Sequence, residues 1–583
     1  HGLFRDYLIN QSRHSLGAAR RREVLSRAAE WCDLRGYWRD AIDYALEGEA
    51  TDVAVKIMDR TAASFVRNLG DTRQYIAWAE GVHARQQVLG WDGEYWFIWA
   101  LVLNQRYDDG RKQMERFARQ LDRALAAGTD VEHLGDLKRR LEIIRVCIDV
   151  FTDRLGDAHR KARQWLEHAD ADDPFDVVVA NCAQSIHYAS AYQFAEARES
   201  ALIAQSASFQ SGSAYAKGWI AVFNALPAVL QGNYSLVYPE LAASLESLRR
   251  ELGDSTGICG TVAFLAAECA VEMGRYDEAR SMIDLAQHTA FSHGMLDVMA
   301  RGLNAAVNLW TGESDSSIRI AELRQIAGSY PPRLTFMFAC SLVRRMLRLG
   351  QIDEARAEAA RSGISTDAPL SPTRWNATAS SRDLHHATLI DLRVATGVSR
   401  YGDAMIADEF KRARSEGRVL RQVELLLTQT VLASHEGKKD AAHRHLTQAL
   451  SLAASRSIVR PFNDHAQTIA LLVEETKPSS WGFALAQERS FFADICRRLP
   501  ITNRALQDKL EALNIETHLF DALTPRQVEL LGLLDAGLSN QQIADRINVS
   551  LATVKGHLLN LYAKLDVSSR SAALAKARAL KLL

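Results

Sequence analysis

A short pattern that recurs along the chain constrains its fold more than any other feature. Residues 274–280 read Gly-Arg-Tyr-Asp-Glu-Ala-Arg and residues 350–356 read Gly-Gln-Ile-Asp-Glu-Ala-Arg, with weaker copies at 192–198 and 437–443 and others near Gly36 and Asp403. Turn residues at positions 156, 192, 232, 274, 312 and 350 are spaced by 36, 40, 42, 38 and 38 residues. A period of this size indicates an array of repeated structural units.

Each copy has the composition of two antiparallel helices joined by a short turn. A small turn residue lets the helices approach, the following Ala packs closely, and Asp or Glu stabilises the start of the second helix. One such pair cannot bury its apolar face alone, so pairs stack into an α-solenoid with a concave surface. The period and the Gly-x-Tyr-x-x-Ala pattern resemble tetratricopeptide repeats of a slightly long kind.

Length and composition indicate several helical units in a reduced, aqueous compartment. The chain has 583 residues, of which 47% are hydrophobic and 24% charged, and a single core stops growing near about 250–300 residues. We find no apolar run approaching eighteen residues and no signal peptide. The seven Cys show no Cys-x-x-Cys spacing, which favours free thiols. We therefore expect a cytoplasmic protein without a membrane partner.

Residues 522–583 depart from the repeat and indicate four short helices. Thr524 is placed to cap a helix that begins at Pro525, and Gly537 is suited to end it. Ser539 and Gln542 form a capping-box pair at the start of a second helix. The apolar positions expected to face inward are Leu523, Leu530, Leu531, Leu534, Ile543, Ala544 and Ile547.

A third helix is predicted after a tight turn, with Ser550 as its cap. Its inner face carries Val554, Leu558, Leu561 and Leu565 at helical spacing. Two helices separated by a tight turn, with the second presented outward, form the helix-turn-helix arrangement.

The outer face of this third helix has the properties of a probe for the DNA major groove. Small residues on the side opposite the buried face, here called the crest, let the helix backbone lie deep in a groove. Polar residues on the two flanks of this side, the shoulders, reach phosphates or, for Asn560, a base edge. The crest carries Ala552, Gly556, Leu559 and Ala563, and the shoulders carry Thr553, Lys555, His557, Asn560 and Lys564. From Leu551 to the end, six Lys or Arg face one acid, Asp566. This local charge favours double-stranded DNA as partner; the alternative is a small helical bundle with a solvated basic surface.

Residues 522–583 resemble the C-terminal DNA-binding domain of the LuxR family of bacterial transcription regulators. The resemblance implies a four-helix domain whose third helix enters the major groove and whose last helix pairs with its twin in a homodimer or higher oligomer on DNA. The implied DNA-binding residues are Ser550, Ala552, Thr553, Lys555, Gly556, His557, Leu559, Asn560, Lys564, Ser568 and Arg570. Ala573, Leu574 and Ala577 give the last helix a small-residue face, which predicts that it mediates dimerisation.

The chain departs from the family pattern in two places, the first helix and the outer face of the third. Gln527 and Val528 replace a common acid and base in the first helix, and Leu559 stands where a base-reading Arg or Lys is frequent. We therefore expect specificity at Leu559 to depend on contact with a thymine methyl group.

The segment from His1 to Leu8 is similar to the motif that ends the winged-helix module of large LuxR-type regulators of the MalT-like group. That resemblance implies an ATPase module, an effector-sensing solenoid and a LuxR-type domain in this order. No Gly-x-x-x-x-Gly-Lys-Ser/Thr loop occurs here, so we expect a fragment or shortened relative without cofactor, with ATP bound only by a module ahead of His1. The predicted domains are a winged-helix end (1–30), the repeats (31–498), a connector (499–521) and the helix-turn-helix domain (522–583).

The repeat region shows no nucleophile paired with a base and no metal-ligand spacing, so we expect no catalysis and no metal. Two aromatic clusters either pack within helix pairs or line an effector pocket: Trp91, Tyr95, Trp96, Phe97 and Trp99, and Tyr215, Trp219 and Trp310. The prediction is an all-α transcription regulator whose solenoid binds a small-molecule or protein effector. The alternative is a protein-interaction scaffold tethered to DNA, without a small ligand.

Overall fold

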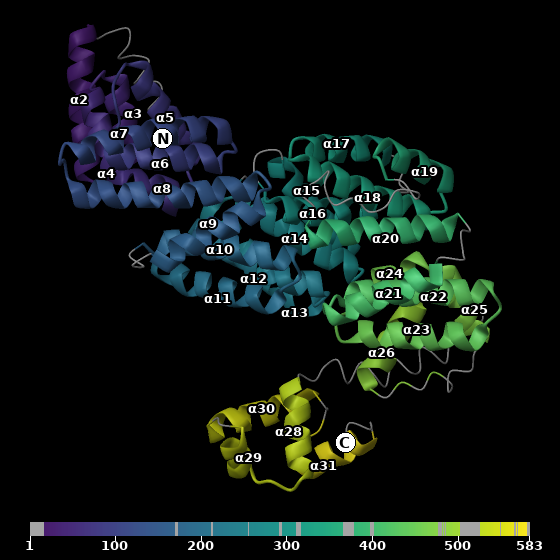
Figure 1. Ribbon diagram of the computed structural model, residues 1–583. Coiled ribbons are helices and arrows are strands. Elements are labelled where there is room, and N and C mark those ends of the chain that lie inside the picture. The colour runs from purple at the N-terminus through teal and green to yellow at the C-terminus, as the bar shows by residue number, and fades with distance from the viewer. Residues whose placement is uncertain are drawn as a thin grey trace. The chain divides into compact units, whose positions relative to one another are not determined.

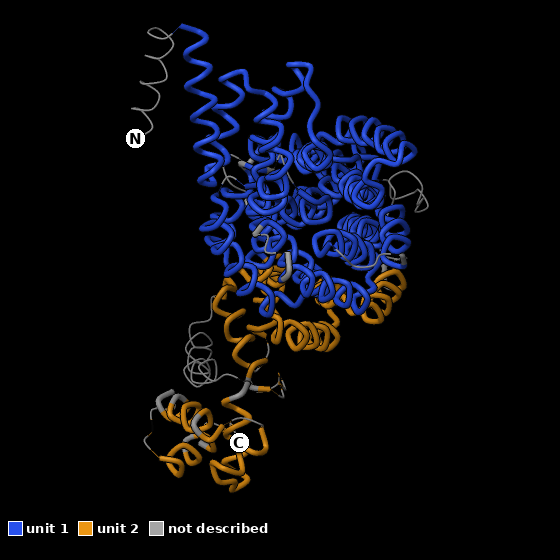
Figure 2. The backbone as a smooth tube through the Cα atoms, turned by 90° about the vertical axis from the view of Figure 1, so that its left-hand side faces the viewer, with its two compact units in different colours: residues 1–271, 275–399 blue, residues 272–274, 400–583 orange. Residues whose placement is uncertain are grey.

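The computed structural model confirms an all-α chain that ends in a helix-turn-helix domain. It describes residues 17–168, 173–211, 214–254, 256–290, 294–310, 316–364, 378–396, 402–475, 481, 483, 485–501, 525–547, 550–564, 567 and 569–579. Within these ranges every regular element is a helix. The chain divides into two compact units, residues 1–271 with 275–399 and residues 272–274 with 400–583 (Figure 2).

The first unit is a series of antiparallel helix pairs, and Figure 1 shows the pairs from α6/α7 to α12/α13 in chain order. Its elements are α2 (Ala18–Leu34), α3 (Trp38–Glu47), α4 (Thr51–Ala63), η1 (Ser64–Asn68), α5 (Thr72–Ala84), α6 (Trp91–Leu103), α7 (Tyr107–Ala126), α8 (Val131–Phe151), α9 (Leu155–His168), α10 (Pro174–Ser190), α11 (Phe194–Ser211), α12 (Ala214–Gln231), α13 (Tyr234–Leu252), α14 (Gly257–Glu272), α15 (Tyr276–Ala290), α16 (Leu296–Trp310), α17 (Ser316–Gly328), α18 (Pro332–Arg348), α19 (Ile352–Arg361) and α20 (Ala379–Ala395). Pair partners pack on each other, as α6 with α7, α8 with α9, α10 with α11 and α12 with α13 do. The first helices of these successive pairs, α6, α8, α10 and α12, also touch. Packing within each pair and between successive pairs is characteristic of an α-solenoid.

The second unit continues the pairs and then carries the terminal domain. Its elements are α21 (Gly402–Ser415), α22 (Val419–His435), α23 (Lys439–Ala454), α24 (Arg460–Asp464), α25 (Ala466–Glu475) and α26 (Ala486–Arg498), followed by α28 (Pro525–Asp535), α29 (Asn540–Arg546), α30 (Leu551–Lys564) and α31 (Arg570–Ala579).

The recurring sequence pattern has one structural meaning in every described copy. The turn residue adopts a positive φ at Gly274 (71°), Gly350 (75°), Gly437 (71°) and, without a glycine, Tyr192 (62°). The next residue's N–H donates to the carbonyl five residues earlier, as from Gln351 to Met346 at 2.9 Å, which ends the first helix in a Schellman motif. The alanine five residues after each turn residue is fully buried: Ala197, Ala279, Ala355 and Ala442 are 0% exposed. The repeat is therefore a helix stop followed by a close-packing position.

Some predicted turns and boundaries fall elsewhere. Gly156 lies inside α9, and the positive φ of that turn (64°) belongs to Asp153. Thr378 accepts a hydrogen bond from the Ser381 N–H (3.3 Å) and caps the start of α20. Gly312 and most of the connector lie outside the described residues, and the boundaries at 30, 498 and 521 stay predictions. In the described part of the chain, no helix is long and apolar enough to cross a membrane.

A buried arginine joins three helices of the first unit. Arg333, in the first turn of α18, is only 1% exposed. Its Nε donates to both carboxylate oxygens of Asp153 (2.9 and 3.0 Å), and its Nη1 and Nη2 donate to Asp297 (3.0 and 2.8 Å). Asp153 follows α8 and lies 180 residues from Arg333 in the sequence, while Asp297 is in the first turn of α16.

Burial and the shared cation act on these carboxylates in opposite directions. Burial raises the pKa of Asp153, and the Arg333 charge only partly offsets this. Burial also raises the pKa of Asp297, but the charges of Arg333 and Arg301 with the hydrogen bonds from Arg333 and Ser380 outweigh it, so the pKa is lowered overall. The cation therefore compensates two carboxylates that water does not reach.

Arg333→Met is expected to destabilise the first unit by about 3–5 kcal/mol, because it leaves two buried carboxylates without a counter-charge. Without Arg333, the two buried carboxylates take up protons at a higher pH, and their protonation removes part of the destabilisation. In the wild type, the Arg333–Asp297 ion pair stabilises the fold until the pH falls below the normal Asp range. We expect the difference in stability to shrink between pH 7 and pH 5. Urea unfolding of both proteins at the two pH values measures this. Arg356→Met, an exposed arginine on α19, is the control; an equal loss there would contradict the explanation.

Candidate nucleic-acid interface

The terminal domain is built around a small apolar core to which all four helices contribute. Ten fully or almost fully buried residues form it: Leu530, Leu531, Leu534, Ile543, Ala544, Val554, Leu558, Leu561, Ala573 and Ala577. Ile547 packs against this core partly buried. The predicted inward faces of the first three helices are confirmed, except for Leu523 and Leu565, which lie outside the described residues.

Caps determine where these short helices begin and end. The Ser539 Oγ accepts from the Gln542 N–H (3.3 Å) and the Gln542 Oε1 accepts from the Ser539 N–H (2.8 Å), which is the predicted capping box. The Ser550 Oγ accepts from the Thr553 N–H (3.1 Å) at the start of α30. Gly537 has a φ of 82° and follows the end of α28, as predicted. Thr524 lies outside the described residues.

The face of α30 opposite the core is open to solvent. Thr553, Lys555, Gly556 and Leu559 are exposed, and Leu559 is 71% exposed although it is a large apolar residue. A Cβ atom on Gly556 would have no neighbour within 4 Å. His557 is half-buried. The side chains of Ala552, Asn560 and Lys564 are outside the described part, so their predicted contacts stay predictions.

The first turn of α30 brings backbone N–H groups and hydroxyl groups together. The Ser550 and Thr553 hydroxyl oxygens lie 2.7 Å apart at this end of the helix, and Lys555 lies two residues after Thr553. Helix N-termini favour phosphate oxygens because their N–H groups are unpaired and their dipole is positive there. The N-terminal end of α30 is therefore suited to bind a DNA phosphate. The exposed face of the helix is suited to contact base edges in the major groove.

Arg570 has a structural role that sequence reasoning missed. Its Nη1 donates to the Leu538 carbonyl and its Nη2 to the Leu534 carbonyl, each at 2.7 Å. The guanidinium thus satisfies carbonyls at the end of α28 and joins them to the start of α31. Its proposed phosphate contact stays a prediction, and Ser568 lies outside the described residues. The signal available in the sequence was only that a cation stands at the start of the last helix.

The predicted dimerisation face needs correction. Ala573 and Ala577 are 0% exposed and belong to the domain's own core, while Leu574 is half-buried against it. Their small size serves the close approach of α31 to α28, with which it packs. Two buried alanines cannot offer a surface to a second copy. Among the residues of α31 whose side chains are described, Ser571, Ala575 and Arg578 are exposed, and Arg578 is paired with Asp535 at 2.6 Å.

The two departures in the first helix have different surroundings. Gln527 is buried, whereas Val528 is exposed. Close to the core, burial raises the pKa of Tyr562, and the charge of Arg570 partly offsets the effect. The phenol is therefore neutral near pH 7 and acts as a packing residue.

A compact domain with two helices around a tight turn, the second turned outward, is a helix-turn-helix DNA-binding domain. Residues 521–577 match the family described as bacterial regulatory proteins, luxR family. The C-terminal domain is therefore of the LuxR type.

Two of three proteins similar to this chain are named as transcriptional regulators. The chain is 21% identical over 570 residues to the HTH-type transcriptional regulator AlkS of Ectopseudomonas oleovorans, covering 95% of this chain and 60% of that protein. It is 27% identical over 196 residues to the HTH-type transcriptional regulator MalT of Vibrio parahaemolyticus, covering 32% and 22%. The nitrate/nitrite response regulator protein NarP of Escherichia coli K12 is 45% identical over 71 residues, 12% of this chain and 33% of its own. The chain spans at most 60% of the length of these three relatives.

Ala577→Glu is expected to unfold the terminal domain, because it places an unpaired charge in the core at a cost of at least about 3 kcal/mol. Hydrogen exchange of the full chain should show loss of protection across α28 and α30. Ala575→Glu, exposed on the same helix, should change stability by less than about 0.5 kcal/mol. If α28 and α30 keep their protection in the Ala577→Glu variant, residue 577 lies at the surface of the domain and not in its core.

Proposed function

We propose that this protein is a sequence-specific DNA-binding transcription regulator in which the helical-repeat domain senses an effector and controls dimerisation and DNA binding of the terminal domain. The observation that carries the proposal is the division of α30 into a buried face and an exposed one. Val554, Leu558 and Leu561 are buried, while Lys555 and Leu559 are exposed. A LuxR-type domain with this exposed face supports insertion of α30 into a major groove.

Each exposed residue has a role in this proposal. Lys555 and Thr553 bind phosphates and set the orientation of the helix, whereas Leu559 contacts a thymine methyl group. Gly556 allows the backbone to approach the bases because it adds no side chain at the crest. The half-buried His557 contacts the backbone at the groove edge.

Regulation follows if the effector prefers one state of the solenoid. An effector shifts an equilibrium only by its difference in affinity between the states. We propose a homodimer or higher oligomer on DNA, acting in the cytoplasm, with no catalytic step and no cofactor held by this chain. ATP would belong only to a module ahead of the repeats.

A scaffold tethered to DNA, without a small ligand, remains the second candidate. The two candidates differ in one measurement on the full chain: a sensor binds its preferred duplex with an affinity that changes with an effector. A scaffold binds the duplex equally with and without every metabolite in a panel. Selection from a random duplex library, followed by titration of the selected duplex, provides the DNA for both measurements.

Lys555→Gln is expected to weaken binding to the selected duplex by about 1 kcal/mol, roughly fivefold. It should also lower the slope of log affinity against log salt by about 0.9, because one phosphate contact is lost. Fluorescence anisotropy at several salt concentrations measures both quantities. Lys112→Gln, an exposed lysine on α7, is the charge-matched control and should leave both unchanged. An unchanged salt slope in the Lys555 variant would contradict the proposed placement of α30.

Leu559→Arg is expected to change the preferred base pair at one position of the duplex. Arg favours guanine, whereas Leu favours the thymine methyl group, and a good contact discriminates by about 1–3 kcal/mol. Repeating the selection with this variant tests the assignment. An identical preferred sequence would remove Leu559 from the base-reading residues.

A further inference from the structure

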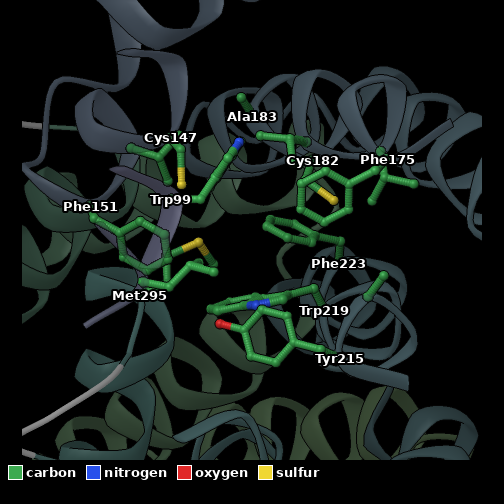
Figure 3. Close-up of a pocket in the computed structure, with 15 residues that line it drawn as sticks. Trp99, Cys147, Phe151, Phe175, Cys182, Ala183, Tyr215, Trp219, Phe223 and Met295 are labelled. Atoms are coloured by element: carbon green, nitrogen blue, oxygen red, sulfur yellow. The ribbon is translucent and has the colours of Figure 1, made fainter. Parts of the chain in front are cut away.

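The first unit contains a cavity among the helices that come first in successive pairs. α6 contributes Trp99, α8 contributes Phe151, α10 contributes Phe175, and α12 contributes Tyr215 and Trp219, while Met295 precedes α16. Figure 3 shows Trp99 and Phe175 on one side of the open space and Trp219 with Tyr215 on the other. One member of the first aromatic cluster and two of the second thus meet, although more than a hundred residues separate them in the sequence.

Aromatic packing holds the walls of the cavity. The rings of Trp99 and Phe175 meet edge to face at 5.4 Å, and those of Phe151 and Trp219 meet at 5.7 Å and 76°. Tyr215 meets the Trp219 ring at 6.4 Å. These contacts join the rings that line the cavity, whose volume is about 70 Å³.

The cavity has the chemistry of an apolar site. Its fifteen lining residues include no Asp, Glu, Lys, Arg or His. Burial raises the pKa of the Cys147 thiol to about 12 and that of Cys182 further, so both sulfurs are neutral. A charged guest would lose its hydration without a counter-charge, which costs far more than apolar contact returns.

Tyr215 and Leu103 separate this cavity from a second, polar hollow of about 220 Å³. Arg73, Asn104 and Thr256 line the hollow. The Tyr215 ring packs against Gly70, where an added Cβ would lie 3.4 Å from the ring. A guest that displaces the Tyr215 ring therefore extends from the apolar cavity toward polar groups.

Two residues that line the cavity lie close in the sequence to the carboxylates that bind Arg333. Phe151 lies two residues before Asp153, and Met295 lies two residues before Asp297, the two carboxylates that share Arg333. A guest that pushes on Phe151 or Met295 therefore acts close to the contact that joins α8, α16 and α18. This proximity connects occupation of the cavity with the packing of distant repeats.

We propose that this cavity is a ligand site for a small neutral molecule with an apolar body, such as a single aromatic ring or a short alkyl chain, whose end lies beside Tyr215. The volume of about 70 Å³ is smaller than the roughly 150 Å³ at which an engineered apolar cavity binds benzene, so a ring-sized guest requires the Tyr215 ring to move toward the hollow. The assignment rests on the proposed function, because it names the chemical class of the effector.

Two probes with the same ring test the class of ligand: toluene and benzoate, titrated into the full chain by calorimetry. Toluene is expected to bind and to raise the thermal midpoint of the repeats, and benzoate is expected to bind at least a hundredfold more weakly. Absence of toluene binding, or equal binding of benzoate, overturns the proposal.

Two variants locate the site on α10. Val179 lines the cavity and is half-buried, so Val179→Phe fills the space without forcing a large side chain into a closed core. Val177→Phe, equally half-buried on the same helix but outside the lining, is the matched control. We expect at least a tenfold loss of toluene affinity for the first and none for the second. Ala183→Leu, also in the lining, repeats the test if the first variant folds poorly.

The same protein preparation distinguishes the two proposals. Toluene binding that Val179→Phe leaves unchanged places the ligand elsewhere and overturns the cavity assignment, even if the protein selects a duplex normally. Failure to select any duplex overturns the regulator proposal and leaves the calorimetric result to stand for the cavity alone.

Discussion

Burial of a cation between two carboxylates is the constraint on which the packing of the first unit depends. In a solenoid each repeat usually contacts only its neighbours, so distant repeats do not stabilise one another directly. Arg333 departs from this rule, because it joins α18 to α16 and to Asp153, 180 residues away. Removing the Arg333 charge would leave two desolvated carboxylates without a counter-charge. The three groups Arg333, Asp153 and Asp297 therefore keep their arrangement only together. The aromatic cavity lies beside this contact, since Phe151 and Met295 are near neighbours of the two carboxylates in the sequence.

The terminal domain separates its structural work from its binding work at the level of single helix faces. One side of α30 fills the core with Val554, Leu558 and Leu561. The other exposes Lys555 and a large apolar residue, Leu559, which is costly in water unless a partner covers it. The cations are divided in the same way: Arg570 serves carbonyls of α28, whereas Lys555 is exposed. Positive charge near a DNA-binding helix is therefore no proof of a DNA contact for each residue.

The two proposals together describe a route from ligand binding to DNA binding. The proposed ligand fills space between the first helices of four pairs, and this space adjoins the contact that joins distant repeats. The similarity to AlkS covers 95% of this chain and therefore includes both the repeats and the DNA-binding domain of this chain. The sensing step requires a difference in ligand affinity between two states of the repeats, and the cavity offers a site where such a difference is measurable.

Local features were readable from the amino-acid sequence because they depend on neighbours in the chain. The capping box at Ser539, the turn at Gly350 and the buried stripe of α30 need only residues three to seven positions apart. Contacts across the fold were not readable. The spacing of Ala573 and Ala577 indicated a close-packed helix face but not its partner, and only the structure places it against the domain's own core. Likewise, the sequence left open whether Trp99 and Trp219 fill a core or line a pocket. The tertiary structure decided this, because stacking of α6, α8, α10 and α12 brings the rings together around a space that no short-range pattern encodes.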